Sequence, residues 1–224
     1  MKYYPINIEI HGRSVTIVGG GAVAERKCRT LLEAGARVRV IAPTLSRGLR
    51  GLAEKGMIEH LAREYRPGDL AGSFLVFAAT GRRGVSMAVA DEAAEWRIPA
   101  NIADMPERSD FTTPSSVASG DLLLTVSTGG KCPALAREIS GELRERYGEE
   151  YAVTLQVLGA VRERLLAMKM GCHATREILG SLISRGLPSL LRNGAADDVD
   201  RLMREVAGPG FSLGELGVER RDMP

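Results

Sequence analysis

Short apolar runs and amphipathic segments alternate along the first half of the chain. Strand-like runs are found at residues 15–18, 37–42 and 74–79, with weaker strand patterns at 6–10, 57–61 and 99–102. Helical spacing of apolar residues lies between them, at residues 24–35, 45–55 and 85–96. The run FLVFAA at 74–79 is apolar on both faces, which is typical of a central parallel strand. The alternation predicts an α/β fold, an open parallel sheet with helices on both faces.

The pattern changes beyond Asp104. A crossing loop rich in Ser, Thr and Pro, a strand and a helix are predicted in that order, at residues 110–119, 122–126 and 133–147. From Tyr151 the sequence is almost wholly helical. The helical pattern is interrupted at Gly171, 186–188 and 208–210. We therefore expect a helical region to follow the sheet.

Composition and charge narrow the class of protein. The chain has 224 residues, of which 44% are hydrophobic and 26% charged, so it can bury a core. Its net charge of +2 argues against nucleic-acid binding as the main role. No apolar run approaches the ~20 residues of a membrane helix, and the amino terminus lacks a signal-peptide core. The three cysteines are far apart and have no metal-ligand spacing, which predicts a reduced, cytoplasmic protein without a metal site.

The strongest local motif is VGGGAVA at 18–24. It contains the dinucleotide fingerprint Gly19-x-Gly21-x-x-Ala24, with Ala in the third place. Gly19 permits the tight turn, Gly21 lets the backbone approach a pyrophosphate, and Ala24 lets the helix pack closely on the sheet. Because the motif follows a predicted strand and opens a predicted helix, it favours a bound dinucleotide over a plain glycine-rich turn.

The end of the second strand lacks the acid that normally holds the adenosine ribose. An Asp or Glu is expected about 20 residues after the fingerprint, but the chain reads Ile41-Ala42-Pro43-Thr44 there. The ribose must then be held by Thr44 or by the backbone. Without the acid nothing repels the 2′-phosphate of NADP, so both NAD and NADP remain possible cofactors. No arginine immediately follows the strand to favour NADP, since the nearest one is Arg47.

Two further segments could carry chemistry. Asp104 follows the short strand 99–102, where parallel sheets place their ligands, so it is either a general base or a turn residue. The loop STGGKCP at 127–133 leads into a helix with proline in its first turn. Its backbone donors, with Lys131 and Arg137 nearby, indicate either an anion site or a plain strand-to-helix connection.

Three motifs together resemble one family. VGGGAVAERK (18–27), ANIADMPERSDFTTPS (100–115) and STGGKCPALAREI (127–139), in this order and spacing, are similar to those of precorrin-2 dehydrogenases, including the amino-terminal module of siroheme synthase. The resemblance covers residues 1–150 well and the helical tail loosely. We expect the methyltransferase module of the fused enzyme to be absent from this chain.

The resemblance implies an enzyme that oxidises precorrin-2 to sirohydrochlorin with NAD. Some members also insert Fe²⁺, as a substrate, to give siroheme. The family further implies a homodimer. The chain departs from it at Cys132, where a serine is usual.

The resemblance also assigns residues. Ala22 and Val23, with Gly19 and Gly21, would bind the cofactor through the backbone, and Pro43 and Thr44 would lie beside its adenosine. Asp104 would be the catalytic residue and would take a proton from the macrocycle. Substrate carboxylates need cations and N–H donors. The residues that could supply them are Thr128, Gly129, Gly130, Lys131 and Arg137.

These inferences define a domain organisation. We expect a Rossmann-like NAD-binding domain at 1–112, a dimerisation and substrate segment at 113–150, and a helical carboxyl-terminal domain at 151–224. Two alternatives remain open. One is an NAD(H)-binding redox sensor, which would leave Asp104 and the 127–133 loop unexplained. The other is a different small-substrate dehydrogenase, although His60 is the only histidine inside the predicted sheet and no Tyr-x-x-x-Lys motif is present.

Overall fold

The computed structural model describes residues 2–218, and the chain divides into two compact units, Tyr3–Thr113 and Pro114–Pro224. Each unit is described by itself. Within residues 2–218 there is no helix both long enough and apolar enough to cross a membrane.

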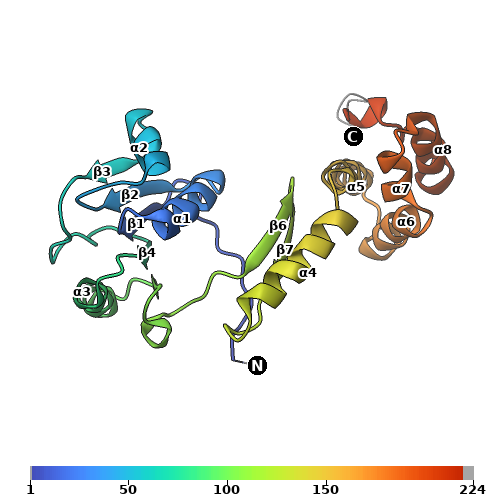
Figure 1. Ribbon diagram of the computed structural model, residues 1–224. Coiled ribbons are helices and arrows are strands. Elements are labelled where there is room, and N and C mark those ends of the chain that lie inside the picture. Colours follow the sequence, from blue (N-terminus) through green and yellow to red (C-terminus); the bar gives the residue numbers. More distant parts are fainter. Residues whose placement is uncertain (1, 219–224) are drawn as a thin grey trace. The chain divides into compact units, whose positions relative to one another are not determined.

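A five-stranded sheet forms the first unit (Figure 1). All strands are parallel and lie in the order β3-β2-β1-β4-β5. Their bounds are Ser14–Val18 (β1), Arg37–Ile41 (β2), Glu59–Leu61 (β3), Leu75–Ala78 (β4) and Ala100–Ile102 (β5). The direction of winding reverses between β1 and β4, and the crevice at such a switch point is where open α/β sheets bind ligands.

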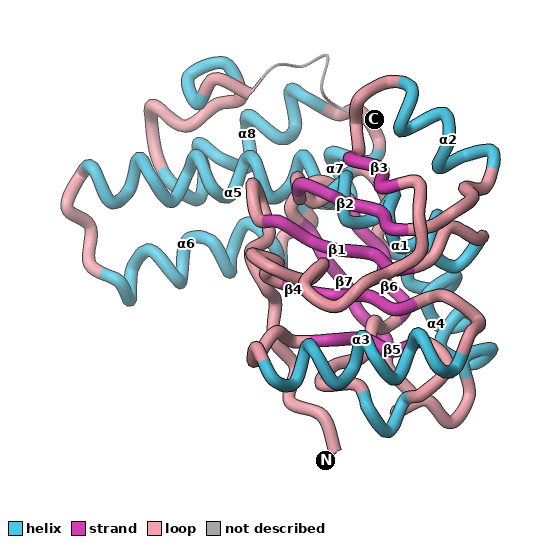
Figure 2. Tube along the Cα trace, turned by 90° about the vertical axis from the view of Figure 1, so that its left-hand side faces the viewer, coloured by secondary structure: helices cyan, strands magenta, loops and turns pink. Residues whose placement is uncertain are grey.

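Alternate residues of the strands enter two separate cores. Val15 and Ile17 of β1 pack towards α1 (Ala22–Glu33) and α2 (Arg47–Glu54), whose apolar faces include Ala24, Cys28, Leu31 and Leu49. Val18 lies in the opposite core with residues of α3 (Arg83–Glu95). The helices therefore cover both faces of the sheet (Figure 2), and the predicted Rossmann-like α/β fold is confirmed.

Two details of the sequence prediction are wrong. Residues 6–10 form no strand, and the side chains of Ile6 and Ile8 are exposed, because no neighbouring strand pairs with this segment within the described chain. The predicted crossing loop at 110–119 contains a strand, β6 (Ser115–Ser119). The Ser-rich sequence of β6 lacks a strand pattern, because β6 forms by pairing with β7 (Leu122–Val126) rather than by burying apolar residues on both faces.

The second unit combines an antiparallel hairpin with helices. Strands β6 and β7 form the hairpin, and α4 (Pro133–Arg146) packs against both. In the described part of the chain four α-helices follow (Figure 2): α5 (Glu150–Ala167), α6 (Cys172–Ser184), α7 (Leu187–Arg192) and α8 (Ala196–Ala207). These helices share one apolar core. The helical tail is thus confirmed, while the boundary at residue 150 stays a prediction.

Candidate functional site

A cavity of about 630 Å³ lies at the carboxyl ends of β1, β2 and β4. Its walls are the glycine turn after β1, the segment 41–46 after β2, residues 64–65 after β3, and the segment 79–85 after β4. The volume falls within the ~300–1,000 Å³ of typical ligand pockets. The cavity therefore occupies the switch point of the sheet, where this fold binds nucleotides.

The three glycines of the turn have different physical reasons to be glycine. Gly19 has φ +121°, and a Cβ there would lie 2.2 Å from the Ala79 carbonyl oxygen. A Cβ on Gly20 would lie 2.0 Å from the carbonyl oxygen of Thr44. A Cβ on Gly21 would meet nothing within 4 Å, although Gly21 lines the cavity. The fold itself requires Gly19 and Gly20, whereas at Gly21 the open space is what a close-approaching ligand would use.

The amino terminus of α1 is available to an anion. Gly21 is its N-cap and offers no side-chain hydrogen bond, so the first N–H groups of the helix keep their donor capacity. The acid of the first turn, Glu25, is engaged elsewhere. Its carboxylate accepts a hydrogen bond of 2.5 Å from the Ser46 hydroxyl and pairs with Arg29 at 2.8 Å. These contacts lower the pKa of Glu25, and the hydrogen bond from Ser46 has the largest effect.

All six residues predicted to bind the cofactor line this one cavity: Gly19, Gly21, Ala22, Val23, Pro43 and Thr44. The structure brings them together from the β1–α1 turn and the end of β2. That they bind the cofactor stays a prediction. Their fit to a dinucleotide rests on the open cradle at Gly21 and on the free helix terminus beside it.

Three residues that line the cavity were not predicted from the sequence. Glu64, Tyr65 and Arg82 also line the cavity, and Arg82 pairs with Glu64 at 2.5 Å. No motif marks them, because they come from the ends of β3 and β4 and meet only through the strand order. The one available signal was positional, since carboxyl ends of parallel strands converge on one edge of the sheet.

Asp104 lies in an exposed turn after β5 and does not line this cavity. Nearby Asp110 has a structural role, because its Oδ2 accepts a 2.9 Å hydrogen bond from the backbone N–H of Ala100. Ser109 and Asp110 thereby fasten the segment after β5 to that strand. Asp104 is left accessible at the edge of the first unit.

The predicted substrate residues belong to the second unit. Gly129 and Gly130 have φ of +63° and +81°, so this loop needs glycine at both positions. The Thr128 hydroxyl bonds both the N–H and the carbonyl of Cys132, at 3.3 and 3.1 Å, and so closes the loop before α4. Lys131 and Arg137 are exposed and form no ion pair with any described residue.

His60, the histidine of the sheet, is engaged by the backbone. His60 is held by the carbonyl of Ala42, 2.9 Å from its Nε2. Among residues 2–218, no group of three His, Cys, Asp or Glu side chains is placed to hold a metal ion.

Known proteins resemble this chain in sequence and in fold. A family described as "Putative NAD(P)-binding" matches residues 6–115. Siroheme synthase 3 of Aeromonas hydrophila is 43% identical over 231 residues, covering 97% of this chain and 49% of that protein. Siroheme synthase of Photobacterium profundum is 33% identical over 218 residues, covering 97% and 46% respectively.

The chain is similar to the amino-terminal module of siroheme synthases. It spans about half the length of the curated relatives it matches. A solved structure, "SirC, precorrin-2 dehydrogenase", has the same fold, with a TM-score of 0.75, 24% sequence identity, and coverage of 92% of this chain and 99% of that one. The segment that matches the family described as "Putative NAD(P)-binding" includes the glycine turn at residues 18–24.

Proposed function

We propose that this protein oxidises precorrin-2 to sirohydrochlorin with NAD in siroheme biosynthesis. The observation that carries the proposal is the open cradle at Gly21, which lines a cavity at the switch point of the sheet. Siroheme synthase relatives and a precorrin-2 dehydrogenase with the same fold support the substrate class.

The residues divide the work between binding and proton transfer. Gly21, Ala22 and Val23 present backbone to the pyrophosphate, while Pro43 and Thr44 hold the adenosine side. When bound, the nicotinamide accepts a hydride from the substrate. Asp104 takes the proton that leaves the macrocycle, and its exposure leaves it open to a large substrate.

The loop before α4 binds the carboxylates of the tetrapyrrole. Gly129 and Gly130 are exposed, and Lys131 and Arg137 add two cations that face solvent. Charge-assisted hydrogen bonds of this kind suit a flexible, polyanionic substrate. Fe²⁺ is a second substrate in this proposal, and the resulting ferrochelation uses the same Asp104 carboxylate to accept pyrrole protons.

We also propose that the active form is a homodimer assembled through the β6–β7 hairpin. Each strand of the hairpin pairs only with the other within the described chain, so both outer edges keep free backbone donors and acceptors. The exposed side chain of Leu123 on β7 adds apolar surface. Sedimentation at micromolar concentration should give twice the 24.1 kDa of the chain, and a monomer would contradict the proposal.

An anaerobic assay tests the function. Purified protein receives precorrin-2 and NAD⁺ first, and Fe²⁺ second, while absorbance follows sirohydrochlorin and then siroheme. Turnover in the first stage supports the dehydrogenase, and turnover in the second supports chelation. A redox sensor would bind NAD(H) without oxidising the tetrapyrrole, and a different dehydrogenase would reduce NAD⁺ only with another substrate.

A further inference from the structure

The connection between β3 and β4 places an acid in the cofactor cleft. Residues 62–74 form this crossover without a helix. The start of the loop lies beside the end of β2, because the Ala42 N–H donates to the Leu61 carbonyl at 3.2 Å and His60 bonds the Ala42 carbonyl. Glu64 follows directly and lines the same cavity as Thr44.

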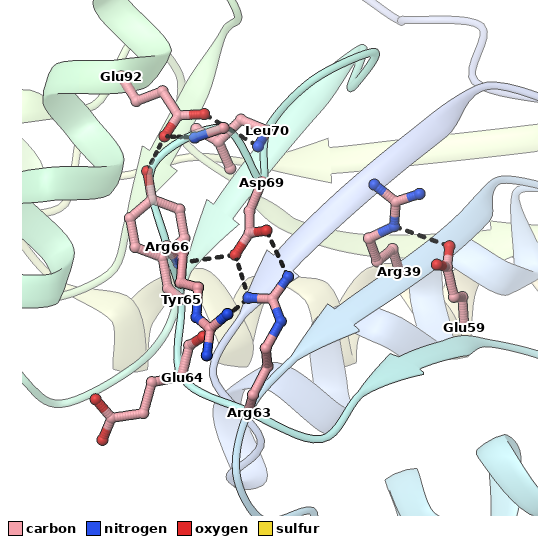
Figure 3. Close-up of polar contacts among 10 residues, drawn as sticks. Arg39, Glu59, Arg63, Glu64, Tyr65, Arg66, Asp69, Leu70 and Glu92 are labelled. Atoms are coloured by element: carbon pink, nitrogen blue, oxygen red, sulfur yellow. Dashed lines mark hydrogen bonds and ion pairs between the residues drawn. The ribbon is translucent and has the colours of Figure 1, made fainter.

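The loop is anchored firmly enough to hold a defined position (Figure 3). The Glu92 carboxylate of α3 is buried and accepts hydrogen bonds from the Tyr65 hydroxyl and from the N–H groups of Gly68 and Leu70, the latter two at 3.0 and 3.1 Å. Burial and the bond to Glu92 raise the pKa of Tyr65, so its hydroxyl stays a donor. Buried carboxylates satisfied in this way rigidify their surroundings.

A second anchor lies on the other side of Tyr65. Asp69 accepts two hydrogen bonds of 2.7 Å from the Arg63 guanidinium and one of 2.8 Å from the backbone N–H of Arg66. The two anchors bracket residues 64 and 65, as Figure 3 shows. The backbone that carries Glu64 into the cleft is therefore held in a fixed position.

Glu64 brings a carboxylate to this end of the cavity. It is the only acid among the residues that line the cavity, and its one ionic partner within the described chain is Arg82, at 2.5 Å. Arg82 is the N-cap residue of α3, so the pair joins the wall after β3 to the wall after β4. Both side chains are about 60% exposed, which leaves their charges accessible to a ligand.

We propose that Glu64 selects NAD over NADP. From the loop after β3, Glu64 supplies the carboxylate that is missing at the end of β2. A carboxylate beside the adenosine ribose accepts hydrogen bonds from its hydroxyls and repels a 2′-phosphate. Arg82 holds Glu64 in place, and the pair leaves no unmatched cation to attract that phosphate. This inference rests on the proposed function, because it requires the dinucleotide to occupy this cleft.

Glu64→Gln tests the selection. Titration calorimetry measures the affinities of NAD, NADP, AMP and adenosine 2′,5′-bisphosphate for the wild-type protein and the variant. Removing the carboxylate and freeing Arg82 should tighten NADP and the bisphosphate about tenfold relative to NAD and AMP, which corresponds to ~1.4 kcal/mol. The double variant Glu64→Gln with Arg82→Gln should lose most of that gain.

A matched control is available on β3. Glu59 pairs with Arg39 at 2.8 Å (Figure 3). Neither residue lines this cavity. Glu59→Gln removes an acid of the same type from a comparable ion pair. It should leave the ratio of NADP to NAD affinity unchanged, and thermal unfolding checks that all variants fold.

The possible failures are distinguishable. If the wild-type protein binds NADP as tightly as NAD, or if Glu64→Gln shifts both affinities equally, the selection by Glu64 is overturned while the dinucleotide site stands. If Glu59→Gln shifts the ratio as much as Glu64→Gln, general surface charge explains the preference and the inference fails. If the wild-type protein binds neither dinucleotide, the proposed function falls and this inference with it.

Discussion

The two units place their candidate site residues in opposite ways. In the first unit, six predicted cofactor residues line one cavity whose shape comes from strand ends and a glycine turn. In the second unit, the predicted substrate cations Lys131 and Arg137 project into solvent from a loop and the first turns of α4. Backbone geometry shapes the first candidate site, and side-chain charge defines the second.

This difference determines how each site should respond to substitution. A site built from backbone and close packing fails sharply when a Cβ is added, because its atoms cannot move apart cheaply. A site built from exposed charges weakens gradually, because each charge contributes little alone. Substitutions in the glycine turn of the first unit should therefore have large, selective effects, and those at the exposed cations of the second unit small, cumulative ones.

The largest effect is expected at Asp104, an exposed residue of the first unit that lies outside its cavity. Asp104→Asn should lower dehydrogenase turnover ~10²–10⁴-fold, the usual contribution of general acid–base catalysis, with NAD affinity kept. Iron insertion should fall in parallel. Steady-state kinetics under anaerobic conditions measure both.

The control for Asp104 is Glu107, an exposed acid in the same turn region. Asp110 is unsuitable, because its carboxylate holds the Ala100 N–H and its loss would disturb β5. Glu107→Gln should keep turnover. Near wild-type turnover in Asp104→Asn would mean that Asp104 is only a turn residue and that solvent accepts the proton.

The next effect concerns the glycine turn. Gly21→Val should place a side chain in the cavity, where its Cβ meets no atom within 4 Å, so the fold survives while NAD affinity falls about fivefold to 150-fold, as expected for ~1–3 kcal/mol of overpacking. Gly20→Val should instead destabilise the unit, because its Cβ would meet the Thr44 carbonyl. Calorimetry and thermal unfolding separate the two outcomes. Equal NAD affinity in Gly21→Val would contradict the cofactor assignment.

The elements that could be predicted from the sequence are those whose own residues carry the pattern, and the elements that depend on a distant partner could not be predicted. Strands such as β4 and helices such as α1 were predictable, because burial on one or both faces leaves a periodic apolar pattern. The strand β6 was not, since its half-exposed Ser-rich sequence needs its hairpin partner. Residues 6–10 have the strand pattern, yet a pattern cannot supply a neighbouring strand.

The candidate site was predictable where one motif holds consecutive residues, as at Gly19 and Gly21. Glu64 and Arg82 escaped, because their proximity depends on the strand order β3-β2-β1-β4-β5 and on a crossover without a helix. The need for glycine at position 20 also escaped, since it arises from the approach of Thr44, a residue that is distant in sequence.

In the second unit we expect small effects. Lys131→Ala and Arg137→Ala should each raise the KM for precorrin-2 by at most about fivefold, because exposed charge pairs contribute ~0–1 kcal/mol. The double variant should show a larger rise with NAD affinity unchanged. Lys169→Ala, in the link between α5 and α6, serves as the control. An unchanged KM in the double variant would place the substrate cleft elsewhere.

The smallest effect is a pH dependence confined to the first unit. Lys27 of α1 donates to the Asn101 Oδ1 at 2.9 Å and lies over the Phe77 ring, 4.7 Å from its centroid. Burial first, and the neighbouring charge of Arg26 second, lower its pKa from 10.5 to about 8. Above that folded-state value the native chain has released a proton that the unfolded chain still holds. The contribution of Lys27 to the stability of the unit should therefore rise as pH increases from about 8 towards 10.5, by the linkage between proton binding and folding.

The comparison between wild type and Lys27→Met isolates this contribution. Urea unfolding at several pH values between 7 and 10 is followed by the fluorescence of Trp96, the single tryptophan, which lies at the end of α3 in the same unit. Cys28 and Tyr65 act in the opposite direction, because their pKa values are raised in the folded state, but they cancel in the difference. The stability difference between the proteins should change in favour of the wild type as pH rises, and Lys131→Met should show no such change. A difference that is flat with pH would mean that the Lys27 ammonium remains solvated and that the first unit holds a cation at little electrostatic cost.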